Sequence, residues 1–181
     1  MISVIVTTLN DEKRLSATLA ALSSAAMDGL VREVIVADGG SADGTLDIAA
    51  EAGARVISGR RDRVLGEARA AARQPWQLIL PAGARLQVGW EQAALSHIRR
   101  RPKARAWFTL SLADEGLSAR MDELMANTQA RLFGRLRPEH GLLIPSAARK
   151  GPRPPAHGLP VRILVGSSPA PVRGELETVS A

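Results

Sequence analysis

Residues 34–45 read VIVADGGSADGT, an apolar run that ends at an aspartate and a glycine-rich turn. The segment from Glu33 to Ala37 is mostly apolar and β-branched, which predicts a buried strand that ends at Asp38. Closely spaced glycines after a strand indicate a tight turn. Thr45 to Ala52 then has the pattern of a short helix, so this stretch predicts one strand–turn–helix unit.

The rest of the chain repeats this alternation of strand and helix. Apolar runs predict further strands at residues 2–7, 54–57, 76–80, 106–112 and 141–144. Helical patterns occur around residues 12–22 and at residues 62–73, 88–101 and 117–133. We therefore expect an α/β fold with a Rossmann-like, mostly parallel sheet that carries helices on both faces.

The carboxyl ends of the strands form the expected ligand-binding edge. Right-handed crossovers place these ends on one edge of a parallel sheet, and ligands bind outside that edge. The connections that fall there are residues 7–10, 38–43, 59–63 and 81–85. We expect these four connections to lie close together, although they are far apart in the sequence.

The chain length of 181 residues fits a single domain. We expect residues 1–146 to form that domain. The stretch from 147 to 181 is rich in proline, which predicts an irregular tail with Val161–Val165 as one apolar anchor.

Composition narrows the classes of function. The chain has no cysteine, which excludes disulfides, thiol nucleophiles and zinc–thiolate sites. Its net charge is +6, and arginines cluster at residues 60–63, 99–101 and 149–153. Few aromatic residues accompany these clusters, so nucleic acid is not the expected partner. A solvated surface and a peripheral membrane contact both stay open as interpretations of the clusters.

The sequence shows neither a signal-peptide pattern nor a membrane-spanning pattern. Residues 1–6 begin directly with a strand pattern and lack a basic leader. No apolar run approaches the roughly 20 residues that a membrane-spanning helix needs. We therefore expect a cytoplasmic location.

Asp38 is the first position that indicates chemistry. A carboxylate at a strand end can accept hydrogen bonds from a ribose or from a base N–H. Gly40 and its neighbours would let the backbone approach a ligand closely. The alternative is a carboxylate that only stabilises its own turn, with Ser41 and Asp43 as helix caps. The dinucleotide and P-loop glycine patterns are both absent from the sequence.

Two segments resemble the opening of family 2 glycosyltransferases, and their separation in the sequence also matches that family. They are SVIVTTLNDE at 3–12 and VIVADGGSADGT at 34–45. The resemblance covers residues 2–101 and implies a GT-A fold that binds a nucleotide-diphosphate sugar. It implies a nucleotide-binding half at residues 1–101 and an acceptor-side half at residues 102–146.

The resemblance also implies roles for single residues. Thr7 and Asn10 would line the nucleotide site, with Glu12 near it and Asp38 at the base. An arginine of the 59–63 connection would approach the base or the diphosphate, and Arg61 and Arg63 are both candidates. An arginine fork suits phosphate recognition.

The metal-binding motif departs from the family pattern. Family members often end the fourth strand with LHADTRL, whose aspartate holds Mg²⁺ or Mn²⁺ against the diphosphate. Here residues 80–86 read LPAGARL, and Gly83 stands where the aspartate is expected. Glycine offers no side-chain oxygen, so we expect no metal ligand at this position. Arg61, Arg63 or Arg85 could offset the diphosphate charge instead.

The general base is the second departure. Beyond residue 139 the only acidic residues are Glu175 and Glu177, in the predicted tail. Glu139 or His140 could serve near the acceptor, and a surface turn is the alternative for both. We expect His97 to be solvated, and Met121 and Met125 to pack in the core.

Three functions therefore stay open at this stage. The first is a glycosyltransferase that works without the usual metal. The second is a catalytically inactive homologue that binds nucleotides or acts as a scaffold. The third is a basic protein that binds nucleic acid or a membrane surface, and only charge supports it.

Overall fold

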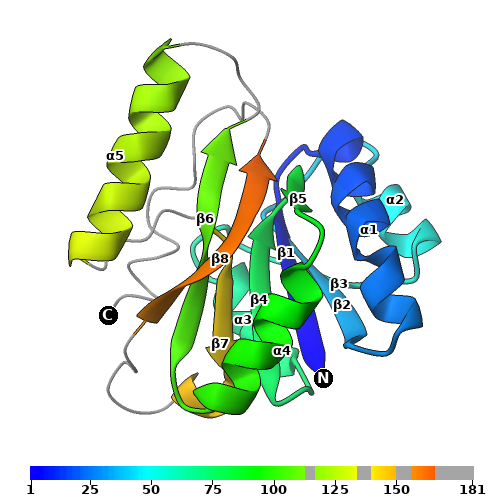
Figure 1. The fold of residues 1–181 in the computed structure, drawn as a ribbon. Coiled ribbons are helices and arrows are strands. Elements are labelled where there is room, and N and C mark those ends of the chain that lie inside the picture. The colour runs from blue at the N-terminus through cyan, green and yellow to red at the C-terminus, as the bar shows by residue number, and fades with distance from the viewer. Residues whose placement is uncertain (113–116, 134–139, 150–155, 166–181) are drawn as a thin grey trace.

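A single mixed sheet forms the centre of the protein in the computed structural model, which describes residues 1–112, 117–133, 140–149 and 156–165 (Figure 1). Its strand order is β3-β2-β1-β4-β7-β6-β8-β5. The strands are β1 (Ile2–Thr8), β2 (Val31–Asp38), β3 (Arg55–Ser58), β4 (Trp76–Pro81), β5 (Ala84–Leu86), β6 (Arg105–Leu112), β7 (Leu142–Pro145) and β8 (Ala156–Val165). The helices are α1 (Glu12–Met27), α2 (Thr45–Glu51), α3 (Val64–Ala71), α4 (Trp90–Arg100) and α5 (Leu117–Phe133).

Strand direction confirms the predicted α/β class. Strands β3, β2, β1 and β4 pair in parallel, and β6 pairs in parallel with β8. Strands β7 and β5 run antiparallel to their neighbours. The sheet is therefore mostly parallel, as the alternation of strands and helices predicts.

Helices cover both faces of the sheet, and each face has its own apolar core. On one face Val4 and Val6 of β1 pack in a cluster that includes Leu15 of α1 and Trp90 of α4. On the other face Ile5 of β1 packs with α3 residues. Because successive side chains of a strand point to opposite faces, the run of apolar residues in β1 contributes to both cores.

The predicted convergence of four connections on one edge is confirmed by the strand register. Thr8 of β1 lies beside Asp38 of β2, and Asp38 lies beside Ser58 of β3. On the other side, Thr7 of β1 lies beside Pro81 of β4. The connections that follow these residues therefore leave the sheet from the same edge.

The prediction of an irregular tail from residue 147 is wrong for residues 156–165, which form β8. This strand lies between β6 and β5 inside the sheet. Its register with β6 shifts after Leu159, which pairs with Phe108, and resumes at Arg162, which pairs with Thr109. Pro160 falls in that shift, where its missing N–H costs no ladder hydrogen bond. One sheet thus extends across the expected boundary at residue 146.

Two expectations about side-chain burial are also wrong. His97 is buried rather than solvated, because it continues the inward stripe of α4 that Trp90 and Ala94 begin. Met121 and Met125 are exposed rather than packed in the core. The helical period predicts an apolar face on α5, but it does not predict that another element covers that face.

Candidate functional site

The turn after β2 is built around the carboxylate of Asp38. One carboxylate oxygen, Oδ1, accepts hydrogen bonds from the hydroxyls of Thr8 and Ser41. The other, Oδ2, accepts from the backbone N–H groups of Gly40 and Ser41, both at 3.0 Å. Gly40 has φ +101°, a conformation that favours glycine. The side chain of Asp38 is buried, and both of its oxygens accept hydrogen bonds within the site. This arrangement agrees with the alternative in which the carboxylate stabilises its own turn.

Asn10 ties the β1–α1 loop to this turn. Its backbone N–H donates to Ser41 Oγ at 2.8 Å, and its side-chain Oδ1 accepts from the N–H of Ala42 at 2.9 Å. Asn10 has φ 55°, which asparagine tolerates better than most residues. Its side chain thus lies at the expected edge of the sheet, on the loop that the sequence assigns to nucleotide binding.

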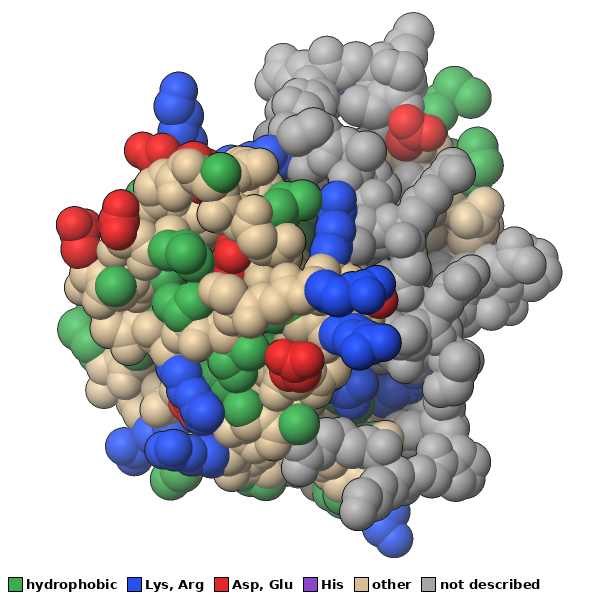
Figure 2. Space-filling view, turned by 180° about the vertical axis from the view of Figure 1, so that it is seen from behind, with side chains coloured by type: hydrophobic (Ala, Val, Ile, Leu, Met, Phe, Trp, Pro, Cys, Tyr) green, Lys and Arg blue, Asp and Glu red, His purple; other side chains and the backbone are tan. Residues whose placement is uncertain are grey.

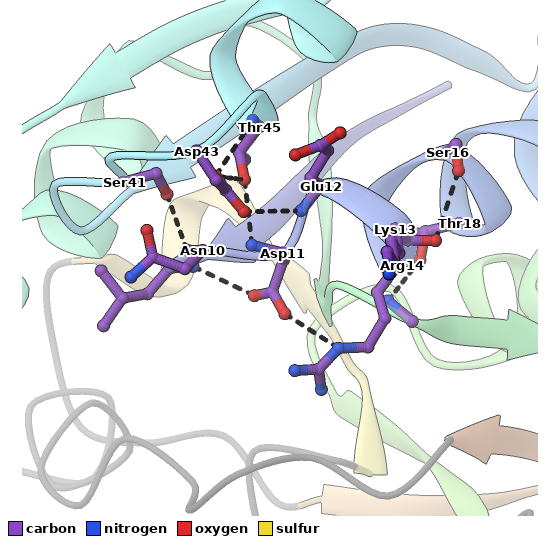
Figure 3. Close-up of polar contacts among 12 residues, drawn as sticks. Asn10, Asp11, Glu12, Lys13, Arg14, Ser16, Thr18, Ser41, Asp43 and Thr45 are labelled. Atoms are coloured by element: carbon purple, nitrogen blue, oxygen red, sulfur yellow. Dashed lines mark hydrogen bonds and ion pairs between the residues drawn. The ribbon is translucent and has the colours of Figure 1, made fainter.

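The carboxylates of Glu12 and Asp43 accept hydrogen bonds from backbone N–H groups where α1 and α2 begin. Figure 3 shows the contacts of Asp43 with Glu12 and Thr45. Glu12 Oε2 accepts from the N–H of Gly44 at 3.2 Å, where α2 begins. Asp43 Oδ2 accepts from the N–H of Glu12 at 3.2 Å, and Asp43 Oδ1 accepts from the N–H of Thr45 at 3.1 Å. These bonds supply acceptors for backbone donors at the starts of both helices.

We call residues 8–12 and 38–45 together the paired loops. Hydrogen bonds from Thr45 lower the pKa of the Asp43 carboxyl, so this acid stays ionised well below neutral pH. The N-cap residue of α2 is Gly44, so neither predicted cap residue occupies that position. Asp43 accepts from the N–H of Thr45, the first residue of α2, and Ser41 bonds to Asp38 and Asn10 instead. The paired loops are therefore held by side-chain-to-backbone bonds on both sides.

The arginines of the 59–63 connection differ in their placement. The stem of Arg61 lies over the turn after β2, since a β-carbon on Gly39 would be 3.5 Å from Arg61 Cγ. Arg60 pairs with Asp62 through two hydrogen bonds, and Arg63 lies 4.0 Å from the same carboxylate. Among the described arginines of this connection, Arg61 is therefore the one whose stem lies against the turn after β2.

The β4–β5 turn contains the position of the expected metal ligand. Gly83 has φ +87°, and its N–H donates to the buried Thr18 Oγ1 at 2.8 Å. A β-carbon at Gly83 would be 3.2 Å from Cδ of Arg14, so the arginine stem covers this residue. Arg85 follows on β5 and is exposed.

The described residues do not fit a hard divalent cation at this position. Gly83 provides no side-chain oxygen, and a cationic side chain, Arg14, lies against it. Within residues 1–112, 117–133, 140–149 and 156–165, no group of three His, Asp or Glu side chains is arranged to hold a metal ion. Mg²⁺ and Mn²⁺ bind through oxygen ligands, usually carboxylates and substrate phosphates.

The acceptor-side candidates fall partly outside the described residues. Glu139 lies outside them, so its role near the acceptor stays a prediction. His140 is buried and packs edge-on against Trp107, with ring centroids 5.4 Å apart. The surface-turn alternative is therefore wrong for His140.

Sequence reasoning missed two residues of this edge, Thr8 and Arg14. Thr8 donates to Asp38 Oδ1 at 3.1 Å, and its carbonyl accepts from the N–H of Gly39. Its place at the end of β1, in a segment already assigned to the site, was the available signal. Arg14 had no such signal, because its proximity to Gly83 depends on how α1 packs against the β4–β5 turn.

Comparisons with known proteins agree with this architecture. Residues 3–76 match the glycosyl transferase family 2 model. Glucosyl-3-phosphoglycerate synthase from Mycobacterium tuberculosis, in complex with Mn²⁺, UDP and phosphoglyceric acid, has a TM-score of 0.62 and 19% identity over 100% of this chain and 74% of its own. The same synthase with Mn²⁺ and UDP-glucose has a TM-score of 0.65 and 18% identity, over 99% and 75% of the two chains.

A second protein of known structure supports the same fold. Among curated proteins, no significant match was found. S. aureus TarS 1–349 has a TM-score of 0.63 and 18% identity, over 81% of this chain and 47% of its own. At 18–19% sequence identity, structural similarity to these proteins establishes that this chain shares their fold. The resemblance seen in the sequence is thus confirmed: residues 3–76 match glycosyl transferase family 2, and the chain has the GT-A fold of the glycosyltransferases to which it is similar.

Proposed function

We propose that this protein binds a nucleotide-diphosphate sugar at the paired loops and transfers the sugar to an acceptor hydroxyl. The observation that carries the proposal is the bonding of residues 8–12 to residues 38–45 at the carboxyl edge of the sheet. Ligands of open α/β sheets bind at this edge. Both loops lie within the segment that matches family 2, and solved structures of similar fold contain UDP or UDP-sugars.

In this proposal the predicted residues keep their roles. Thr7, Asn10 and the backbone at Gly40 contact the nucleotide, and Glu12 orders the loop beside it. Asp38 meets the base when a base N–H displaces the Ser41 hydroxyl from Oδ1, the oxygen that carries only hydroxyl donors. The cations proposed to face the diphosphate are Arg61, Arg63 and Arg85.

Transfer breaks the bond between the sugar carbon and the diphosphate oxygen, and the electron pair stays on the leaving diphosphate. The acceptor oxygen bonds to that carbon and gives its proton to a base, for which Glu139 is the candidate. Cationic side chains stabilise the charge that develops on the leaving group. The donor sugar, the acceptor and the stereochemistry are open.

Release of UDP or GDP from their sugars, measured with and without EDTA, tests the proposal. We expect turnover that EDTA does not abolish. An Asn10→Gly variant removes the amide but permits the positive φ, so its turnover should fall while its fold is retained. Asp47→Ala, an exposed change on α2, is the control and should leave turnover unchanged. No turnover with any donor, across common divalent ions, would refute the transfer step.

A catalytically inactive homologue that only binds nucleotides is the second candidate. Gly83 favours it, because a ligand to the expected metal is missing there, and so does the full engagement of the Asp38 carboxylate. Calorimetry separates the two candidates from a purely structural role. Binding without turnover supports the inactive homologue, and no binding at millimolar nucleotide removes both.

The basic-surface alternative has less support. On the face shown in Figure 2, Lys and Arg side chains occur in separate groups, with neutral and acidic side chains between them. In the described part of the chain, no helix is both long enough and apolar enough to span a bilayer. Peripheral membrane contact and a cytoplasmic location stay part of the proposal. Salt-dependent binding to anionic vesicles or DNA would support this alternative.

A further inference from the structure

The β4–β5 turn brings Arg14 to the place where the family pattern expects a metal-binding aspartate. The three heavy atoms nearest to a β-carbon built on Gly83 all belong to the Arg14 side chain: Cδ at 3.2 Å, Cβ at 3.5 Å and Cγ at 3.6 Å. The stem of this arginine therefore occupies the space that a longer side chain at residue 83 would need. The positive φ of Gly83 disfavours such a side chain further.

Asp11 fixes the position of the Arg14 guanidinium. Arg14 Nε lies 3.1 Å from Asp11 Oδ1, and Asp11 Oδ2 accepts from the N–H of Leu9 at 3.0 Å. Both carboxylate oxygens of Asp11 are thus engaged within the β1–α1 loop. The carboxylate therefore orients the arginine through Oδ1 while Oδ2 holds the backbone of the loop.

The outer end of the guanidinium is open to a ligand. Asp11 is the only partner of Arg14 among the described residues, and it takes Nε, which leaves the two terminal amino groups. The side chain of Arg14 keeps 26% of its surface exposed. Figure 3 shows these terminal nitrogens extending past Asp11 and away from helix α1.

We propose that Arg14 binds the diphosphate of the donor in place of a divalent metal ion. This inference rests on the proposed nucleotide-sugar function and names the side chain that makes diphosphate binding independent of metal. A guanidinium presents paired N–H donors in a planar fork that matches two phosphate oxygens. It also carries a permanent positive charge, which supplies part of the electrostatic effect of a metal.

The other arginines of the edge are placed differently. Arg61 lies over Gly39, at the turn after β2. Arg60 and Arg63 share the carboxylate of Asp62. Arg85 follows the turn on β5 and is exposed. Among the described arginines, Arg14 is the one whose side chain packs against Gly83, so we assign to it the diphosphate contact that a metal ion would otherwise make, beside the arginines already proposed.

Calorimetric titration with UDP and GDP tests the inference, first in excess EDTA and then with Mn²⁺. We expect the wild-type protein to bind at least one of them equally well in both conditions. Arg14→Met keeps the apolar stem over Gly83 and removes the charge. It should weaken diphosphate binding about 10- to 100-fold, the loss expected for charged hydrogen bonds to phosphate.

Matched controls separate a local effect from loss of fold. Lys13→Met removes the neighbouring exposed cation of α1 and should leave the affinity unchanged. Arg14→Lys keeps the charge without the fork and should lie between wild type and Arg14→Met. Thermal unfolding of each variant, followed by circular dichroism, shows whether the fold is retained.

Two outcomes overturn the inference while leaving the proposed function in place. One is nucleotide binding by the wild type that EDTA abolishes and Mn²⁺ restores. The other is a folded Arg14→Met protein that binds the nucleotide as tightly as wild type. A wild-type protein that binds no nucleotide in either condition refutes the proposed function and this inference with it.

Discussion

Replacing Asp38 tests whether its carboxylate holds the turn after β2. In Asp38→Ala the backbone N–H groups of Gly40 and Ser41 lose their acceptor, while the hydroxyls of Thr8 and Ser41 can rotate to other partners. An unsatisfied buried donor costs about 1–3 kcal/mol. Because both N–H groups are only partly buried and water can reach them, we take about 1–2 kcal/mol for each. The free energy of unfolding should therefore fall by about 2–4 kcal/mol.

Asp38→Asn should be much milder. The amide oxygen can accept from both backbone N–H groups, and the two hydroxyls can turn to accept from the amide NH₂. We expect a loss of about 1 kcal/mol or less in the free energy of unfolding. The control Asp47→Ala removes an exposed carboxylate on α2 and should cost about 0.5 kcal/mol.

Equilibrium unfolding in urea measures all three variants on one scale. The expected order of stability is wild type, then Asp47→Ala and Asp38→Asn close together, with Asp38→Ala last. If Asp38→Ala unfolds within about 0.5 kcal/mol of Asp47→Ala, the carboxylate does not hold the turn. If Asp38→Asn costs as much as Asp38→Ala, the negative charge itself is required, and the hydrogen-bond explanation is wrong.

Three further changes test the packing around the sheet. Thr18→Val removes the hydroxyl that accepts from Gly83 N–H and should cost about 1–2 kcal/mol in urea unfolding, and no loss would contradict that role. Gly158→Ala places a β-carbon 2.9 Å from Trp107 Cζ2, so the ring must shift and urea unfolding should show a loss of about 1–3 kcal/mol, and no loss would contradict the tight contact. Burial lowers the pKa of His157 below 6.5 in the native protein, so the unfolded chain takes up a proton on this side chain at a higher pH than the native protein does. The free energy of unfolding should therefore have its full value above pH 6.5 and should decrease as the pH falls below 6.5. This decrease should be smaller in His157→Gln.

The sequence predicts the nucleotide-side half of the fold well, for physical reasons. The strands up to residue 81 are short, mostly apolar runs separated by turn signals, and local pattern determines such elements. The edge of the sheet follows from the handedness of the crossovers, so the meeting of Thr8 with Asp38 could be anticipated.

The second half of the fold depends on long-range pairing that local pattern does not reveal. Strand β8 contains Gly158 and Pro160, which argue against a strand, yet a register shift beside β6 accommodates the proline. Strand β5 has only three residues, and its antiparallel pairing with β8 follows from where β8 lies. No local signal in the sequence predicts either pairing.

The sequence predicts where in the fold the candidate site lies, but it predicts the contacts of the individual side chains only in part. Asn10 and Glu12 lie on the expected loop, but their side chains hold the neighbouring loop, a tertiary arrangement that sequence spacing does not show. His97 could have been placed correctly, since Trp90, Ala94 and His97 recur at helical spacing on one face. Arg14 could not, because its contact with Gly83 joins residues that are far apart in the sequence.

A crystal structure of the protein soaked with UDP or GDP and Mn²⁺ tests the central claim most directly. The claim is that the carboxyl edge of the sheet binds a nucleotide diphosphate at the paired loops. We predict that the nucleoside lies against the paired loops, with the diphosphate on Arg14 and no Mn²⁺ beside Gly83. A nucleotide bound elsewhere, or a Mn²⁺ ion bridging the diphosphate to the β4–β5 turn, would contradict it.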